Sequence, residues 1–226
     1  MDFNALMAPI SLTISLALCV TAILVVIGTP LALWLAHGRG VGKEAVGALV
    51  TMPLVLPPTV LGFYLLLALG PNGPGGWLAG LWGARTLAFS FAGLVIGGVV
   101  GSLPFMVQPL RNCFAAIESE VMEAAATLGA SRLHLFFRVM LPLARPGYLV
   151  GAIMTFAHTI GEFGVVLMIG GNIPGETKVL SIAIYDFVER LEWDKAHVLA
   201  GGMVFFAFVV VFATLMVNRR ANVALR

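Results

Sequence analysis

The chain has 226 residues, of which 60% are hydrophobic and only 11% are charged, and its formal net charge at pH 7 is +2. Soluble domains carry about a quarter charged residues, so this composition and a mean hydropathy of +1.01 exclude an ordinary soluble protein. A basic stripe with interleaved aromatic residues is also missing, which argues against nucleic-acid binding. We therefore expect the chain to lie in a lipid bilayer.

Five segments are apolar enough to cross a bilayer, which takes about 20 residues in a helix. The runs are residues 3–36, 45–84, 86–110, 148–169 and 198–218, and Glu162 in the fourth is the one charge among them. We place the second span near residues 49–69 and the third near residues 87–107. Strands of a membrane barrel would be shorter and alternating, so we predict an all-α polytopic membrane protein with about five transmembrane helices.

The first run is expected to remain as a true span. Asp2 precedes it without any Lys or Arg, and the run is too long for the apolar region of a cleavable signal. Cys19 and Cys113 fall in or beside spans and lack the CxxC spacing, so we expect neither a disulfide framework nor a metal site.

The second span contains Pro53, Pro57 and Pro58. Each proline removes a backbone donor and clashes with the preceding turn, so the span is expected to break or kink there. An ordinary kink stabilised by neighbouring helices is one interpretation. Irregular backbone at membrane depth survives only where protein or water satisfies it, so three prolines in six residues also make a cavity-lining segment plausible. The following PNGPGG stretch, residues 71–76, predicts a turn.

A loop at about residues 112–146 separates the third and fourth spans. Residues 118–128 favour a helix, Gly129 is its natural left-handed stop, and Ser131 can cap a second helix that runs until Pro142. The loop is thus structured and presents small side chains at a tight corner. From the residues alone, a docking site for a partner and simple packing on the bundle remain equally open.

The basic residues indicate an orientation. Arg39 and Lys43, the arginines of the 112–146 loop with Arg111, and the C-terminal arginines fall on one side, which predicts a cytoplasmic C-terminus and an outside N-terminus. On the opposite side, residues 179–191 predict a short amphipathic helix. Its apolar face is expected to contain Leu180, Ile184, Phe187, Val188 and Leu191, with Asp186 elsewhere on the turn.

Catalytic motifs are missing from the sequence. HGRGVGKE, residues 37–44, departs from the phosphate-binding loop at His37 and Glu44, so any ATP must be bound by another chain. An intramembrane hydrolase needs a nucleophile and a base at membrane depth. His158 has no partner at a suitable spacing and is interpreted as polar packing with Thr155 or Glu162.

The 112–146 loop matches a known pattern. EAA at residues 123–125 is followed after three residues by Gly129, and after nine more by VMLP at residues 139–142. This spacing resembles the EAA motif of bacterial ABC importer membrane subunits and departs from it only by Val139 in place of isoleucine.

The resemblance implies that a short coupling helix of this loop sits in a cleft of an ATP-binding subunit. The docking corner would comprise Glu123, Ala124, Ala125 and Gly129, while Leu141 and Pro142 would set the return into the membrane.

Two further stretches, residues 53–66 and 156–189, look like the permease subunits of molybdate importers, which gives the type I ABC importer permease fold as one domain over residues 1–226. The implied function is translocation of molybdate delivered by a periplasmic binding protein, across the bacterial inner membrane. The implied assembly is a homodimer with two cytoplasmic ATPase subunits, which bind ATP and Mg; this chain holds no cofactor. Alternatives are a permease for tungstate or sulfate, or a self-sufficient channel or secondary transporter.

The candidate gate or pathway residues are polar groups and chain breaks within the spans. Glu162 would repel a dianion, so it is a better gate or helix–helix hydrogen-bond partner than a ligand. Alternatively it marks the outer end of its helix and reaches the headgroups. The other candidates are Thr155, Thr159, Pro57 and Pro58, with Ser102 and the backbone near Gly97, Gly98 and Gly101 as less specific ones.

Overall fold

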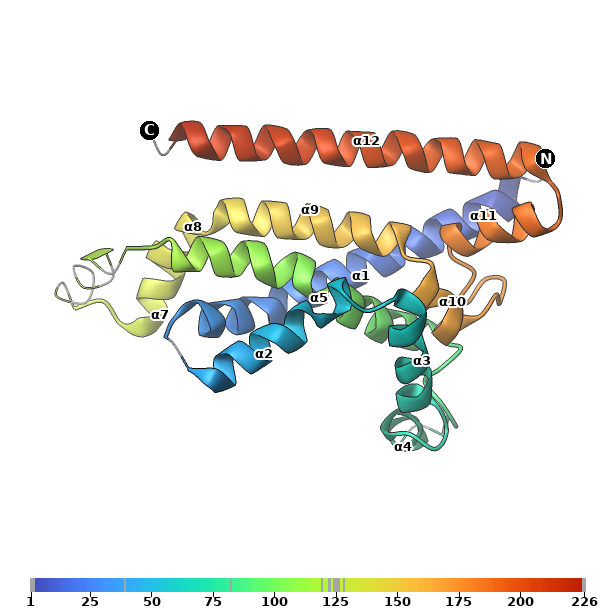
Figure 1. Ribbon diagram of the computed structural model, residues 1–226, viewed down its shortest axis with the longest axis horizontal. Coiled ribbons are helices and arrows are strands. Elements are labelled where there is room, and N and C mark those ends of the chain that lie inside the picture. The colour runs from blue at the N-terminus through green and yellow to red at the C-terminus, as the bar shows by residue number, and fades with distance from the viewer. Residues whose placement is uncertain are drawn as a thin grey trace.

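The computed structural model describes residues 3–38, 40–81, 83–118, 120–121, 123, 127 and 129–224. Every regular element within these ranges is helical (Figure 1), as the all-α prediction expects. The longest helices are α1 (Phe3–Ala36), α5 (Phe91–Ala115) and α12 (Trp193–Ala224). The shorter ones are α2 (Val41–Thr51), the 3₁₀ helix η1 (Met52–Leu54), α3 (Pro58–Leu69), α4 (Pro74–Gly80), α7 (Arg132–Leu135), the π-helix η2 (Phe136–Met140), α8 (Leu141–Leu143), α9 (Arg145–Gly161), α10 (Gly164–Gly170) and α11 (Leu180–Glu189).

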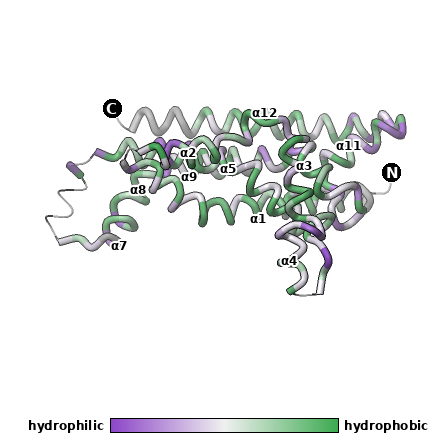
Figure 2. Tube along the Cα trace, turned by 60° about the horizontal axis from the view of Figure 1, so that its bottom comes forward, coloured by the Kyte–Doolittle hydropathy of each residue, from purple (hydrophilic) through white to green (hydrophobic). Residues whose placement is uncertain are grey.

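The described part of the chain supplies three to five membrane spans. Met7–Ala36, Phe91–Ala115 and Trp193–Met216 are each long and apolar enough to cross a bilayer. Two bent pairs, Val41–Leu54 with Pro58–Leu69 and Leu133–Leu143 with Arg145–Gly161, raise the number to five if each pair is one span. Figure 2 shows the apolar stretches along the helices and hydrophilic residues near α7 and at the α11–α12 junction.

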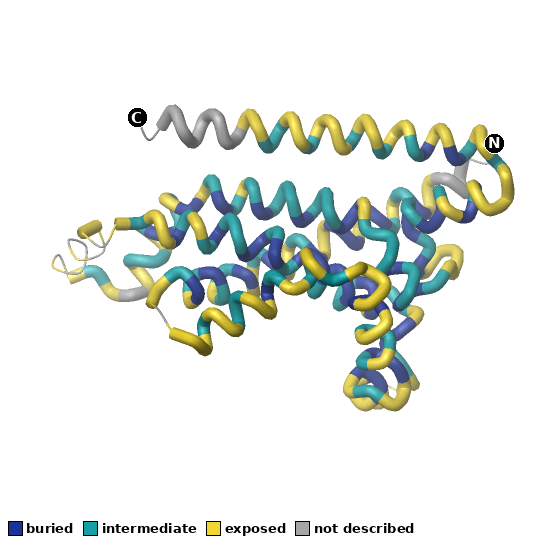
Figure 3. The backbone as a smooth tube through the Cα atoms, viewed as in Figure 1, coloured by how far each residue is buried: buried dark blue, intermediate teal, exposed yellow. Residues whose placement is uncertain are grey.

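The core lies where α1, α5 and α9 pack together. Its largest buried side chains include Leu16 and Leu24 of α1 and Met106 and Leu110 of α5. Small residues let these backbones approach closely: a Cβ added to Gly151 of α9 would lie 2.9 Å from the Met106 sulfur. Figure 3 shows this buried interior against the mostly exposed α12, which packs on α9 and α11.

The bundle has two distinct ends. The N-terminus, α10 and α11 lie at one end, called the α11 end, while the C-terminus, α7, α8 and the α1–α2 turn lie at the other, called the α7 end (Figure 1). The short helices α3 and α4 project sideways from the bundle, because α3 turns 111° away from α2 at the proline-rich break.

Several local predictions need correction. The helical run after Ser131 ends at Leu143, one residue beyond the predicted stop at Pro142. The chain then bends by 67° between α8 and α9, around Ala144. The fourth span ends at Gly161, not near Ile169, because the backbone leaves helical geometry at Glu162.

The predicted apolar face of α11 is confirmed in part. Leu180, Ile184 and Phe187 pack, partly buried, against Ala183 and Leu199, whereas Val188 and Leu191 are exposed. The burial of Asp186 on α11 was not expected, and its pairing with cations makes that burial tolerable. In the third span, α5 runs from Phe91 to Ala115, later than the predicted 87–107.

Candidate functional site

Two helix breaks lie against each other near the α11 end. The first separates η1 from α3, where Pro57 has an extended backbone and Pro58 begins α3. The second separates α9 from α10 at Glu162 and Phe163. A Cβ added to Gly164, the first residue of α10, would lie 2.7 Å from the Pro58 Cβ. The predicted candidates Pro58 and Glu162, remote in sequence, thus belong to neighbouring breaks.

The contact between α3 and α10 depends on a second glycine. A Cβ on Gly62 of α3 would approach the Met168 Cβ to 2.7 Å and the Val165 Cα to 3.2 Å. Pro57 and Pro58 are themselves exposed. The breaks therefore combine tight backbone packing on one side with an open surface on the other.

Glu162 occupies the second break as a capping residue. Its Oε1 accepts a hydrogen bond of 3.0 Å from the Val165 N–H, in the first turn of α10. Its backbone carbonyl accepts a hydrogen bond of 2.7 Å from the Ser181 hydroxyl of α11. The side chain is only 11% exposed. Glu162 therefore ends α9, starts α10 and joins both to α11.

His158 connects Glu162 to α5. Its Nε2 lies 3.5 Å from the Glu162 Oε2, and its Nδ1 lies 3.1 Å from the Ser102 hydroxyl. The ring stacks on Phe105 with centroids 4.2 Å apart. Sequence reasoning missed Ser102 as the partner of His158 because 56 positions separate them. The available signal was the helical spacing of Thr155, His158, Thr159 and Glu162, which places polar groups along one side of α9.

Ser102, His158 and Glu162 follow one another like the residues of a catalytic triad, but they do not form the active site of a hydrolase. The Ser102 hydroxyl is buried and also lies 3.0 Å from the Thr159 hydroxyl, so a substrate cannot reach it. The three side chains are better described as a polar connection between helices.

The two predicted threonines, Thr155 and Thr159, are buried inside the bundle. Thr159 donates a hydrogen bond of 2.9 Å to the Thr155 carbonyl and borders Ser102. Thr155 is fully buried, and among the described residues its hydroxyl has no hydrogen-bond partner. Their predicted role in lining a pathway stays a prediction.

At the α7 end, the 112–146 loop presents a surface. Gly129 has φ +77°, the left-handed geometry that favours glycine, and the Ser131 hydroxyl accepts a hydrogen bond of 3.3 Å from the His134 N–H. Glu123 is exposed, whereas Ala124 and Ala125 lie outside the described residues.

The segment that leads from Gly129 back to the bundle carries large exposed apolar side chains. Leu133 is 72% exposed and Phe137 is 58% exposed, and Leu143 is also exposed. Leu141 and Pro142 are half-buried in α8. Leu133–Leu143 also belongs to one of the two bent pairs that can each form one span, so these side chains suit contact with lipid or with another protein.

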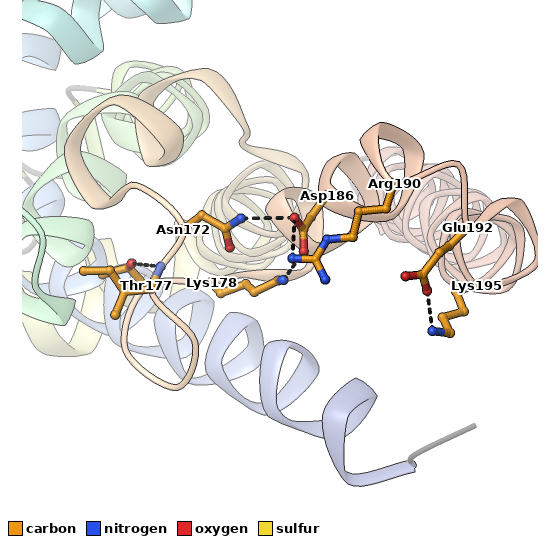
Figure 4. A network of polar contacts seen from close by, with 8 residues as sticks. Asn172, Thr177, Lys178, Asp186, Arg190, Glu192 and Lys195 are labelled. Atoms are coloured by element: carbon orange, nitrogen blue, oxygen red, sulfur yellow. Dashed lines mark hydrogen bonds and ion pairs between the residues drawn. The ribbon is translucent and has the colours of Figure 1, made fainter.

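A network of polar contacts holds the loop before α11 (Figure 4). The Asp186 carboxylate pairs with the Lys178 ammonium and, at 3.1 Å, with the Arg190 guanidinium, and accepts a hydrogen bond of 3.4 Å from Asn172. The hydrogen bond from Lys178 holds the pKa of Asp186 below its ordinary value. Thr177 donates 2.6 Å to the Gly170 carbonyl and accepts 3.2 Å from the Ile173 N–H. Sequence reasoning did not identify this network.

No group of three or more His, Cys, Asp or Glu side chains in the described ranges is placed to hold a metal ion. The polar clusters at the α11 end consist of hydrogen bonds and ion pairs between elements.

Comparison with known proteins decides the family. The model of the binding-protein-dependent transport system inner membrane component matches residues 28–222. The chain belongs to this family. The resemblance predicted from the EAA motif is thereby confirmed, and the chain is a multi-pass membrane protein of a transport system.

Two relatives of this chain are permease proteins of molybdenum transport systems. The chain is 56% identical over 207 residues to the molybdenum transport system permease protein ModB of Azotobacter vinelandii, covering 92% of each chain. It is 37% identical over 180 residues to ModB of Haemophilus influenzae, covering 78% of this chain and 79% of that protein.

Solved structures show the same fold at low sequence identity. An inward-facing form of the MetNI methionine ABC transporter gives a TM-score of 0.71 at 18% identity, covering 98% of this chain and 99% of that one. A bacterial ABC transporter that imports alginate gives 0.64 at 17% identity, covering 98% and 84%. The predicted type I ABC importer permease fold is confirmed.

Proposed function

We propose that this chain is the membrane-spanning permease subunit of an ATP-driven importer that translocates molybdate. The observation that carries the proposal is the 56% identity to a molybdenum transport permease across 92% of both chains. This identity extends over 207 residues. The chain itself supplies the transmembrane path, and ATP and Mg are bound by a partner.

The partner that hydrolyses ATP docks at the 112–146 loop. Glu123, Ala124, Ala125 and Gly129 form the docking corner, and Leu141 and Pro142 set the return into the membrane. Support comes from the exposed Glu123, the left-handed Gly129 and the exposed apolar residues after it. A pre-shaped corner beside exposed apolar side chains suits a rigid-body contact that transmits motion.

The loop faces the cytoplasm and the α11 end faces outward. Arg111, Arg138 and Arg145 lie at or near the loop, as basic residues do on the cytoplasmic side of inner membranes. In this orientation the C-terminus is cytoplasmic and the N-terminus lies outside. A periplasmic binding protein then delivers its anion at the α11 end.

The working unit is a homodimer in which two copies enclose the pathway. Exposed apolar residues of α2 and α3, such as Leu49, Phe63 and Leu67, suit a second copy or lipid. The adjoining breaks at Pro57, Pro58 and Glu162, with Thr155 and Thr159 behind them, are the gate candidates. Approach of the ATPase subunits would move the two loops together and reorient the cavity as a two-state interface.

Uptake of labelled molybdate tests the proposal. Cells that carry or lack this chain, with the ATPase and binding protein present, are compared in excess sulfate and in excess tungstate. Uptake that requires the chain and resists sulfate is the expected result. Uptake abolished by sulfate would move the substrate to a broader oxyanion class, and uptake that does not require the chain would contradict the proposal.

A further inference from the structure

A series of contacts through Ser102, His158 and Glu162 joins four helices at one point. Ser102 belongs to α5 and His158 to α9, while Glu162 caps α10 and accepts the Ser181 hydroxyl of α11 through its carbonyl. The described conformation of the α9–α10 break therefore depends on contacts that extend across the end of the bundle.

His158 is the central residue of this series of contacts. It is the residue that contacts both Ser102 and the Glu162 carboxylate, and stacking on Phe105 fixes the plane of its ring. Side chains this polar are costly to leave unpaired at membrane depth. A displacement of α9 against α5 that separates Ser102 from His158, or of α10 against α9 that moves Glu162 away from His158, breaks one of these contacts.

The neighbouring break, between η1 and α3, couples such a movement to the contact between α10 and α3. Gly164 follows Glu162 by two positions and packs on Pro58, so the orientation of the Glu162 cap sets how α10 meets α3. A transporter alternates between two arrangements, and contacts present in one arrangement bias the balance toward it.

We propose that His158 is a positioning residue that holds Glu162 in the α9–α10 break and so latches the α11 end of the transporter until the binding protein docks. The inference rests on the proposed function. Breaking the latch lowers the cost of the alternative arrangement without removing any residue from the ATPase contact. ATP hydrolysis in the absence of the binding protein then rises, and less molybdate is moved per ATP.

The test uses the complete transporter in phosphatidylethanolamine–phosphatidylglycerol vesicles, with and without binding protein. His158→Leu removes both contacts. His158→Gln keeps an amide near the Nε2 position facing Glu162, and His158→Asn keeps one near the Nδ1 position facing Ser102. His197→Leu, at an exposed position of α12, is the matched control.

Without binding protein, His158→Leu and His158→Asn are expected to raise hydrolysis about five- to tenfold, the effect of losing the contact to Glu162, with or without the Ser102 hydrogen bond. His158→Gln is expected to restore hydrolysis to within about twofold of wild type, and His197→Leu to match wild type. A purely structural role would lower hydrolysis and assembly, and would not raise hydrolysis.

Three results overturn the inference: unchanged hydrolysis in His158→Leu, reduced hydrolysis in every His158 variant, or rescue by asparagine instead of glutamine. If His158→Leu fails to assemble, the comparison of glutamine with asparagine decides. Failure of the wild-type transporter to take up molybdate would count against the proposed function, whereas the hydrolysis ratios do not depend on the substrate.

Discussion

Residues 171–179 at the α11 end are fastened by their own side chains, through Thr177 and the pairing of Lys178 with Asp186. Residues 129–143 at the α7 end instead present Leu133, Phe137 and Leu143 to their surroundings. Both segments connect helices in the same chain. The difference indicates that polar contacts within the chain hold residues 171–179, whereas residues 129–143 leave apolar side chains for lipid or for the ATPase subunit proposed above.

The largest expected effect comes from reversing a charge at the α7 end. Glu123→Lys is expected to abolish uptake and release the ATPase subunit, because Glu123 belongs to the proposed docking corner, while the chain still folds and inserts. Co-purification of the ATPase and labelled molybdate uptake measure this. Glu120→Lys makes the same charge change at an exposed position three residues away and is expected to retain both activities. An intact complex with normal uptake in Glu123→Lys would remove the docking corner from the account.

Packing between the two breaks can be tested with a single methyl group. Gly164→Ala places a Cβ 2.7 Å from the Pro58 Cβ, which is expected to destabilise the fold by about 1–3 kcal/mol. Gly161→Ala is the control, since a Cβ there meets no described atom within 4 Å. Thermal unfolding in detergent measures both. Equal melting temperatures for the two variants would show that the breaks do not pack as described.

Ion pairs of Asp186 help to hold the α11 end together, so its stability depends on pH. Asp186→Asn is expected to lower stability by about 1–2 kcal/mol at pH 7, because Lys178 and Arg190 lose their shared anion. The pKa of Asp186 is lowered in the fold, so its contribution is present above the ordinary aspartate pKa of about 3.9 and is lost as the pH falls through the lowered value.

Unfolding of wild type and Asp186→Asn across pH 3–7 measures this. The difference between the two proteins is expected to be constant near neutrality and to shrink on acidification. A difference that grows as the pH falls would have the wrong sign for this pairing.

The smallest expected effect concerns the corner of the loop. Gly129→Ala puts a side chain at φ +77° and costs about 1 kcal/mol, which is expected to weaken retention of the ATPase subunit about fivefold. Gly202→Ala, at a helical position of α12 where a Cβ meets no described atom, is expected to have no such effect. Unchanged retention in Gly129→Ala would mean that the corner is not pre-shaped for docking.

Local rules were enough to predict some of this from the sequence. Apolar length predicted the three long spans, Pro57 and Pro58 predicted the break before α3, and the glycine at 129 predicted the left-handed turn. The burial of Asp186 on α11 was not predicted because the sequence pattern gives no sign that Asp186 pairs with Lys178 eight positions earlier.

The candidate site was predictable in part. Glu162, Pro57 and Pro58 were singled out by composition, but their assembly depends on the glycine contact between α3 and α10. The partnership of Ser102 with His158 arises from the packing of α5 on α9, which spacing along one helix does not contain. Pairings of this kind are set by tertiary structure and become visible only when the helices are placed.

The most direct test of the central claim is transport by purified components. Vesicles containing this chain, the ATPase and the external binding protein are supplied with ATP and labelled molybdate, and accumulation inside is followed. We expect accumulation that requires ATP, the ATPase and the binding protein together. Accumulation in vesicles that contain this chain alone would contradict the account and identify a self-sufficient channel or secondary transporter.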